Sequence, residues 1–410
     1  MKIKISKHNT AQILLIYVML LSNQSIIYES TLKNFVTVLL GLSCVYLLLI
    51  YRGKLVKDYG ILLAVFLLAV TIFIRFWVGG VGILAWADWA LKILLVVAAV
   101  RIDIERFLTN YLKVVCVLAV CSIVGFFMDL INPNIWGIIT PFSTMSVMGN
   151  KLHGMFLYVT GDQARNRGLF TEPGVYQIVL NTALFICAFF RDKLLVSDKY
   201  LRGAFVVIVI AIVTCQSTTG YIGLFSILLF VSFSNDLNKT RNKVRVIVIL
   251  VVLLGLLEYS INGESGLVGS KILGKLINLD WSGKEDTGST GYWRILLWNI
   301  CIEAISKNPI GIGFDQFDAI IENTGAAGAS LLQFMVAMGV IPGIVVLCWY
   351  FYPLIKRQRT SLLCTCSYIF LYLNTMLAQT SPFYPALIMI PIYLMECDEK
   401  KQHIMYKWKR

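Results

Sequence analysis

The sequence predicts an all-α polytopic membrane protein with about twelve transmembrane helices. Of its 410 residues, 58% are hydrophobic and 14% are charged, whereas about a quarter of the residues in ordinary soluble domains are charged. The mean hydropathy is +0.76. A third observation is that basic residues recur in every second connection between apolar runs, as the positive-inside rule requires.

A membrane-spanning helix needs roughly 20 apolar residues. Apolar runs of this kind predict spans at 11–28, 34–51, 60–78, 81–100, 111–131, 173–190, 203–216, 219–233, 246–260, 330–353, 361–378 and 382–396. They divide the chain into N-terminal membrane helices (1–131), a first large outer loop (132–172), central membrane helices (173–260), a second large outer loop with an amphipathic helix (261–329), C-terminal membrane helices (330–396) and a basic tail (397–410).

The distribution of charge sets the predicted orientation. With the N-terminus in the cytoplasm, the inner connections and the tail hold most of the 36 basic residues, whereas the short outer turns hold almost none. Both termini are then cytoplasmic, and both long loops lie on the outer face of the membrane. The net charge of +13 follows from this orientation, so no nucleic-acid partner is predicted.

The first outer loop ends in RNRGLFTEPG at 165–174, which contains Arg165, Arg167 and Glu172. The planar guanidinium group can grip a phosphate with two hydrogen bonds, so the two arginines suit an anionic ligand. Contact with lipid headgroups is the alternative interpretation. Thr171 and Glu172 also suit the start of a helix, where they would serve only as cap and first-turn residues.

The second outer loop predicts a helix from about 290 to 306, ended by Asn308 and Pro309. Its polar residues share one face, and Arg294 falls on the opposite, apolar face. An arginine on that face either extends to the membrane interface or points toward an anionic ligand. The Gly311-x-Gly313 turn that follows suggests a tight backbone.

Three charged residues fall inside predicted spans, namely Arg75, Asp88 and Lys92. Asp88 and Lys92 are spaced as i, i+4 partners on a helix. Charges within a membrane are candidates for function, and a mutually paired structural cluster is the alternative.

No metal or cofactor site is predicted. The three histidines, His8, His153 and His403, lack the spacing of zinc ligands, and the chain has no glycine-rich phosphate loop.

The order of several motifs resembles the O-antigen polymerase/ligase superfamily. These motifs are the outer-loop arginines before Gly168-x-Phe170-x-Glu172-Pro173, the turn Gln216-Ser217-Thr218-Thr219-Gly220, Arg294-x-x-Leu297-Trp298, Pro309-x-Gly311-x-Gly313, and Ser330-Leu331-Leu332 leading to Gly339-Val340-Ile341-Pro342-Gly343. The likeness covers the pattern of residues 160–345 and the predicted topology of the rest.

This resemblance implies a function. Members of the superfamily are polytopic proteins of the bacterial inner membrane, so the resemblance implies a GT-C-like architecture with two large periplasmic loops. They transfer glycans from undecaprenyl diphosphate at the periplasmic face, and the resemblance implies transfer without metal. The ligases carry a histidine just before the return to the membrane, whereas this chain has Thr324-Gly325-Ala326-Ala327-Gly328-Ala329 there. The departure favours a Wzy-type polymerase that joins oligosaccharide repeat units into O-antigen or capsule, with a chain-length regulator as a further candidate partner.

By the same resemblance, Arg165, Arg167 and Arg294 bind and neutralise the diphosphate. Trp298 and Gln316 are further candidate substrate-binding residues. The candidate catalytic residues are these three arginines together with Glu172 as the base, or Asp315 as the less favoured base.

Two alternative functions stay open at this point. One is an O-antigen ligase of the same superfamily. The other is a twelve-span polysaccharide or solute transporter, although transporters favour substrate sites at the membrane midplane and internal repeats. This chain instead carries its longest loops and its arginine motifs on one outer side.

Overall fold

We describe the protein from a computed structural model. The structure describes residues 7–29, 41, 59–79, 83–134, 136, 146–147, 150–153, 158–161, 165–233, 290–322, 328–356 and 361–408. The predicted spans at 34–51 and 246–260, and most of the second large loop before residue 290, lie outside these residues.

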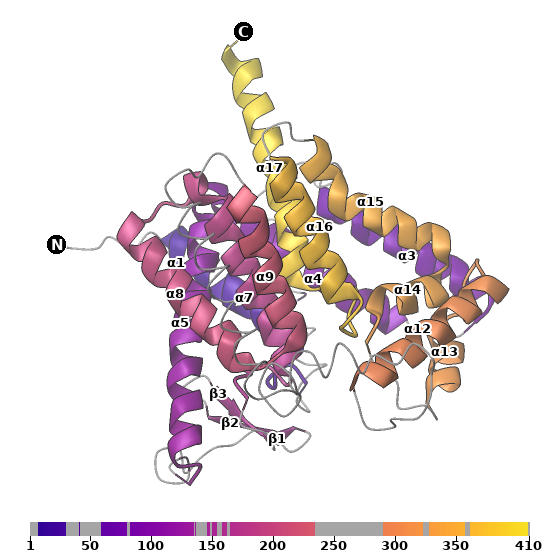
Figure 1. Ribbon diagram of the computed structural model, residues 1–410. Coiled ribbons are helices and arrows are strands. Elements are labelled where there is room, and N and C mark those ends of the chain that lie inside the picture. The colour runs from indigo at the N-terminus through magenta and orange to yellow at the C-terminus, as the bar shows by residue number, and fades with distance from the viewer. Residues whose placement is uncertain are drawn as a thin grey trace.

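The described chain is mostly helical, as the sequence predicts (Figure 1). The longer helices are α1 (Lys7–Leu21), α3 (Tyr59–Trp77), α4 (Ile83–Ile102), α5 (Ile104–Ile131), α7 (Pro173–Phe189), α8 (Asp198–Cys215), α9 (Thr218–Phe233), α12 (Thr290–Lys307), α13 (Phe314–Ile321), α14 (Ser330–Met338), α15 (Val340–Lys356), α16 (Leu362–Met376) and α17 (Pro385–Trp408), and η3 (Arg191–Lys193) is a short 3-10 turn.

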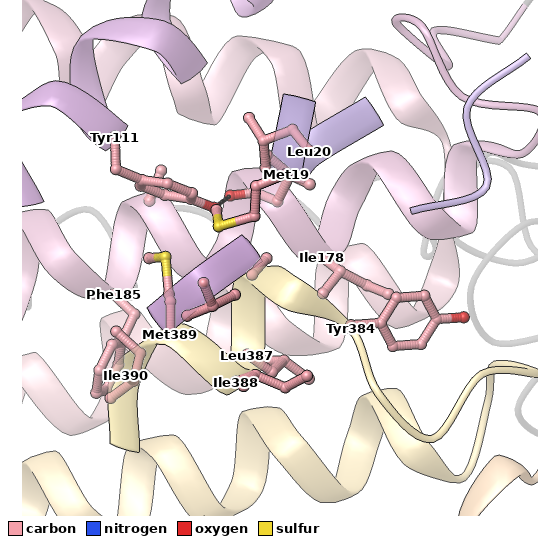
Figure 2. Close-up of a cluster of buried hydrophobic side chains, with 14 of the residues drawn as sticks. Met19, Leu20, Tyr111, Ile178, Phe185, Tyr384, Leu387, Ile388, Met389 and Ile390 are labelled. Atoms are coloured by element: carbon pink, nitrogen blue, oxygen red, sulfur yellow. Dashed lines mark hydrogen bonds between the residues drawn. The ribbon is translucent and has the colours of Figure 1, made fainter. Parts of the chain in front are cut away.

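Helix α7 lies at the centre of the fold. Nearly every residue from Pro173 to Cys187 is buried, which is expected for a helix that is apolar all round. It packs against α5, α8, α9, α16 and α17. Figure 2 shows the core where these elements meet α1, with Met19, Tyr111 and Phe185 gathered around the first turns of α17.

Much apolar surface faces outward. Phe76 is 89% exposed at the end of α3, and Ile131 is 82% exposed at the end of α5. These two helices are long and apolar enough to cross a membrane, and several shorter apolar helices accompany them within the described residues. Exposed apolar surface of this extent is typical of contact with lipid or another protein.

The first outer loop departs from the expected all-α fold, because it contains a small antiparallel sheet. Strand β1 (Ser146–Val147) pairs with β2 (Asn150–His153), and β2 pairs with β3 (Tyr158–Thr160). The sheet lies beside the far end of α5 (Figure 1). Tyr158 anchors it there, with its ring packed against Gly125.

Two predicted spans are not continuous helices. The first helix stops at Leu21, and residues 22–29 form a turn. The run 330–353 is broken between α14 and α15 at Gly339, whose φ of +97° is a conformation that favours glycine.

The break at Gly339 is filled by the chain that follows α12. The backbone N–H groups of Ile312 and Gly313 bond to the carbonyls of Val336 and Ala337 at 2.9 and 3.0 Å. A side chain on Gly339 would collide with the carbonyl oxygen of Ile310. The Gly311-x-Gly313 turn therefore joins α12 to α14 through main-chain contacts.

Candidate functional site

The segment 165–168 is fixed by a buried asparagine. The Asn166 side-chain amide donates to Ser122 Oγ at 3.2 Å and to Thr214 Oγ1 at 2.9 Å. Its carbonyl oxygen accepts the Gly168 backbone N–H at 3.1 Å. Because the residue between Arg165 and Arg167 is held in this way, the two arginines leave the backbone in fixed directions.

Arg165 reaches the turn between α8 and α9. Its Nη2 donates to the backbone carbonyl of Gln216 at 2.6 Å, and Gln216 is in the left-handed conformation that ends α8. The Arg165 Nε is buried without a hydrogen-bond partner among the described residues. Burial and the neighbouring Arg167 lower the pKa of Arg165, and the Glu172 carboxylate acts in the opposite direction.

Arg167 turns toward the sheet of the first loop. It is 8% exposed, and its Nη1 donates to the side-chain oxygen of Asn150 on β2. Gly161 leaves room for this contact, because a Cβ at that position would overlap both side chains and would force them to shift. The sheet thus serves as the support for one of the two arginines.

Glu172 is the N-cap residue of α7, and its side chain makes no capping hydrogen bond. The side chain is exposed. The prediction that Thr171 caps this helix is also wrong. The Thr171 hydroxyl and backbone N–H both donate to the backbone carbonyl of Gln24 at 3.1 Å. The Glu172 carboxylate is therefore not used to hold the helix end.

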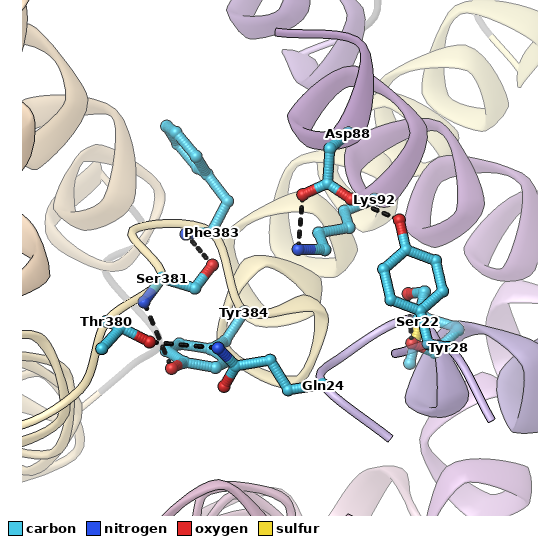
Figure 3. Close-up of polar contacts among 10 residues, drawn as sticks. Ser22, Gln24, Tyr28, Asp88, Lys92, Thr380, Ser381, Phe383 and Tyr384 are labelled. Atoms are coloured by element: carbon cyan, nitrogen blue, oxygen red, sulfur yellow. Dashed lines mark hydrogen bonds and ion pairs between the residues drawn. The ribbon is translucent and has the colours of Figure 1, made fainter. Parts of the chain in front are cut away.

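The loop between α16 and α17 joins this region to α12. Gln24 Nε2 donates to Thr380 Oγ1 at 3.0 Å (Figure 3). The backbone N–H of Ser330 bonds to the Gln379 carbonyl at 2.8 Å. A Cβ on Gly328 would lie 3.2 Å from the Ala378 carbonyl oxygen and 3.6 Å from Cγ of Arg294.

Arg294 lies on the inward side of α12, as the sequence predicts, with Leu297 and Cys301 fully buried on the same side. Its guanidinium makes no hydrogen bond or ion pair with any part of the chain that the structure describes. Burial lowers the pKa of Arg294, and the Glu172 carboxylate counteracts that effect. An unpaired, largely desolvated guanidinium has a strong affinity for an anion.

Of the remaining candidate residues, Trp298 lies one helical turn after Arg294 on α12, whereas Asp315 and Gln316 lie on α13. The Trp298 indole N–H is engaged by the Leu377 carbonyl at 3.3 Å, so this side chain fastens α12 to the α16–α17 loop. Asp315 and Gln316 are exposed on the first turn of α13. No contact among the described residues brings either of them to Arg165, Arg167 or Arg294.

The charged residues of α3 and α4 do not form one cluster. Lys92 is 5% exposed, and its Nζ lies 2.7 Å from Asp88. Asp88 also accepts a hydrogen bond from the Tyr28 hydroxyl (Figure 3). Arg75 is exposed on the last turn of α3. The i, i+4 pair is confirmed, and Tyr28 is a third member that no local sequence pattern indicates.

The Glu172 carboxylate acts electrostatically on two candidate arginines from distant parts of the sequence, Arg165 and Arg294. Arg167 is close to Arg165, but its guanidinium bonds to Asn150 on the sheet. Among the described residues, two guanidinium groups near one carboxylate suit a ligand with more than one negative charge. Within the described ranges, no group of three His, Cys, Asp or Glu side chains could hold a metal ion.

Sequence reasoning missed the residues that support the arginines. Asn150, which bonds to Arg167, and Gln24, which holds Thr171 beside Glu172, belong to no motif, and each acts through a contact distant in the sequence. Gln216 belongs to the Gln216–Gly220 motif, but its contact with Arg165 was not predicted. Comparisons of the chain with family models, with curated proteins and with solved structures found no match.

Proposed function

We propose that this chain is a multi-pass inner-membrane glycosyltransferase of the Wzy-type polymerase class. It joins oligosaccharide repeat units carried on undecaprenyl diphosphate, at the periplasmic face. The observation that carries the proposal is that the Glu172 carboxylate, which makes no capping bond, acts electrostatically on both Arg165 and Arg294. The order of the motifs along the chain adds the resemblance to the O-antigen polymerase/ligase superfamily.

Diphosphate binding accounts for the charge at this site. In glycosyl transfer, the bond from the anomeric carbon to the diphosphate oxygen breaks, and its electron pair goes to the diphosphate. The leaving group gains one negative charge in that step, and guanidinium groups already in place stabilise it. Arg294 has no protein partner to give up among the described residues, so all its donors are available.

Glu172 supplies the base in the proposed reaction. A hydroxyl of the acceptor repeat attacks the anomeric carbon of the donor glycan, and its proton passes to the Glu172 carboxylate. The products are the lengthened glycan on the acceptor's carrier and free undecaprenyl diphosphate. The exposed carboxylate, which makes no capping bond, supports this role.

The test is complementation of a strain in which this gene is deleted, followed by gel analysis of surface polysaccharide. Replacing Arg294 with Ala should reduce long-chain polymer by about 100-fold or more, since a lost transition-state donor costs about that much in rate. Arg106→Ala is the matched control, because Arg106 is exposed at the start of α5 and pairs only with nearby Asp103 there.

Three outcomes separate the functions. Loss of polymer from the carrier in the deletion strain supports a polymerase. Polymer that accumulates on the carrier without reaching its final acceptor indicates a ligase instead. Normal chain length with Arg294→Ala, at normal protein level, would remove Arg294 from the site.

A further inference from the structure

The α16–α17 loop carries a polar side chain that the proposed reaction has not used. Gln379 is 5% exposed, and its carboxamide makes no hydrogen bond with the described part of the chain. Its backbone is well held, because its N–H bonds to the Thr375 carbonyl at 3.0 Å and its carbonyl accepts the Ser330 N–H at 2.8 Å. The side chain is thus largely enclosed by protein, and its amide has hydrogen-bonding capacity that the described residues do not use.

The carboxamide is aimed at the first turn of α7. A Cβ built on Gly174 would lie 2.6 Å from Gln379 Nε2 and 3.3 Å from Oε1. Gly174 is the second residue of a 17-residue helix whose N-cap is Glu172. The backbone N–H groups of a first helical turn have no partner inside the helix. In α7, Pro173 has no N–H, and the N–H groups of Val175 and Tyr176 bond to the Glu172 carbonyl at 3.2 and 3.3 Å. The Gln379 amide therefore lies beside the backbone of Gly174, whose N–H makes no hydrogen bond with the described residues.

This place lies between Arg294 and Glu172. On one side, Ala378 is next to Gly328, and Gly328 is next to the Arg294 side chain. On the other side, Gln379 is next to Gly174, which is two residues after Glu172. In the proposed reaction the sugar ring of the donor lies between its leaving diphosphate and the group that receives the proton. The Gln379 carboxamide is thus placed where that ring would lie.

The chemistry of the side chain distinguishes a sugar from a phosphate. A diphosphate only accepts hydrogen bonds, and guanidinium groups satisfy it. A sugar hydroxyl both donates and accepts, and a carboxamide matches it with two donors and one acceptor. Glutamine adds no charge to a site that already holds the Arg165 and Arg294 guanidinium groups.

We propose that Gln379 is a sugar-binding, specificity-determining residue: its carboxamide bonds to a hydroxyl of the donor sugar next to the diphosphate. The proposal rests on the proposed function. Gly174 contributes to this sugar contact, since any side chain there would push the Gln379 amide away from the first turn of α7.

The test measures binding of two probes to the purified full chain in detergent. One probe is the undecaprenyl-diphosphate-linked oligosaccharide extracted from cells lacking this gene, and the other is undecaprenyl diphosphate alone. Gln379→Ala should weaken binding of the first probe about tenfold, the usual effect of one lost hydrogen bond, and leave the second unchanged. Arg294→Ala should weaken both.

A second variant tests the same contact without changing Gln379, in case Gln379→Ala misfolds. Gly174→Ala suits a helix and needs only the flexible amide of Gln379 to move, so it should keep the fold and reproduce the effect of Gln379→Ala. Gly203→Ala is the control, because a Cβ on that helical glycine meets nothing within 4 Å.

The outcomes separate the two proposals. If wild-type protein binds both probes and Gln379→Ala changes neither, or weakens both equally, the sugar contact is overturned while diphosphate binding stands. If the wild-type protein binds neither probe, the proposed function fails and the sugar contact fails with it.

Discussion

Arg167 and Asn150 are joined by a hydrogen bond from the guanidinium Nη1 to the carboxamide Oδ1. Asn150 is the first residue of β2, and its own amide donates to the Thr171 carbonyl at 3.4 Å. A small sheet in the first outer loop therefore positions both an arginine of the candidate site and the residue that precedes Glu172. The sheet and the arginine loop form one structural unit.

Two substitutions of Asn150 should have different effects on stability but should both reduce polymer formation. Asn150→Ala leaves a buried guanidinium without this acceptor, which should lower stability by about 1–3 kcal/mol and reduce polymer formation. Asn150→Asp keeps an acceptor and should retain the thermal midpoint. It also neutralises Arg167, so polymer formation should still fall. Thermal unfolding in detergent and the gel of chain lengths measure the two effects.

Lys151→Ala is the matched control for these variants, because Lys151 is exposed on the same strand. Equal thermal midpoints for Asn150→Ala and wild-type protein would show that the contact does not support the loop.

The Asp88–Lys92 pair gives a prediction about stability. Asp88→Asn removes the charge that faces a lysine with 5% exposure, which should destabilise the protein by about 3 kcal/mol. Removing both charges in Asp88→Asn/Lys92→Met should recover most of that loss, because no buried charge is then left unpaired. The measurement is the thermal midpoint of each variant. A double variant no more stable than the single one would contradict a mutual pair.

His153 gives a prediction about pH. Burial, aided by Lys151, lowers the pKa of His153 below its ordinary value of 6.5. On acidification, His153 is therefore protonated at a higher pH in the unfolded chain than in the folded protein. The contribution to stability is full above pH 6.5 and falls as the pH drops from there toward the folded pKa. The thermal midpoint should thus drop between pH 7.5 and 5.5, and His153→Gln should reduce that drop. Equal drops in both proteins would rule out His153 as the cause.

Local patterns predicted the helical elements and the inward face of α12. The short pair 203–216 and 219–233 also corresponds to two helices, α8 and α9, separated by the left-handed Gln216. The length of an apolar run and its helical periodicity are properties of neighbouring residues, so they can be seen in a single sequence. The predicted topology placed the loops of Arg165 and Arg294 on one side of the membrane, and this orientation stays a prediction.

The supporting contacts could not be predicted, because they depend on tertiary neighbours. Strands of two to four residues carry too few side chains to display an alternating period, so the sheet was missed. Gln379 has no charge and belongs to no motif. Its significance depends on the approach of Gly174, more than 200 residues earlier in the numbering.

The main-chain bonds between the Pro309–Gly313 segment and the broken helix pair α14–α15 have an evolutionary consequence. Because the attachment uses peptide groups and glycines, the outward-facing side chains of α12 are free to diverge without moving Arg294. Homologues that recognise different glycans should therefore vary widely on the surface of α12 while they retain the glycines at 311 and 339.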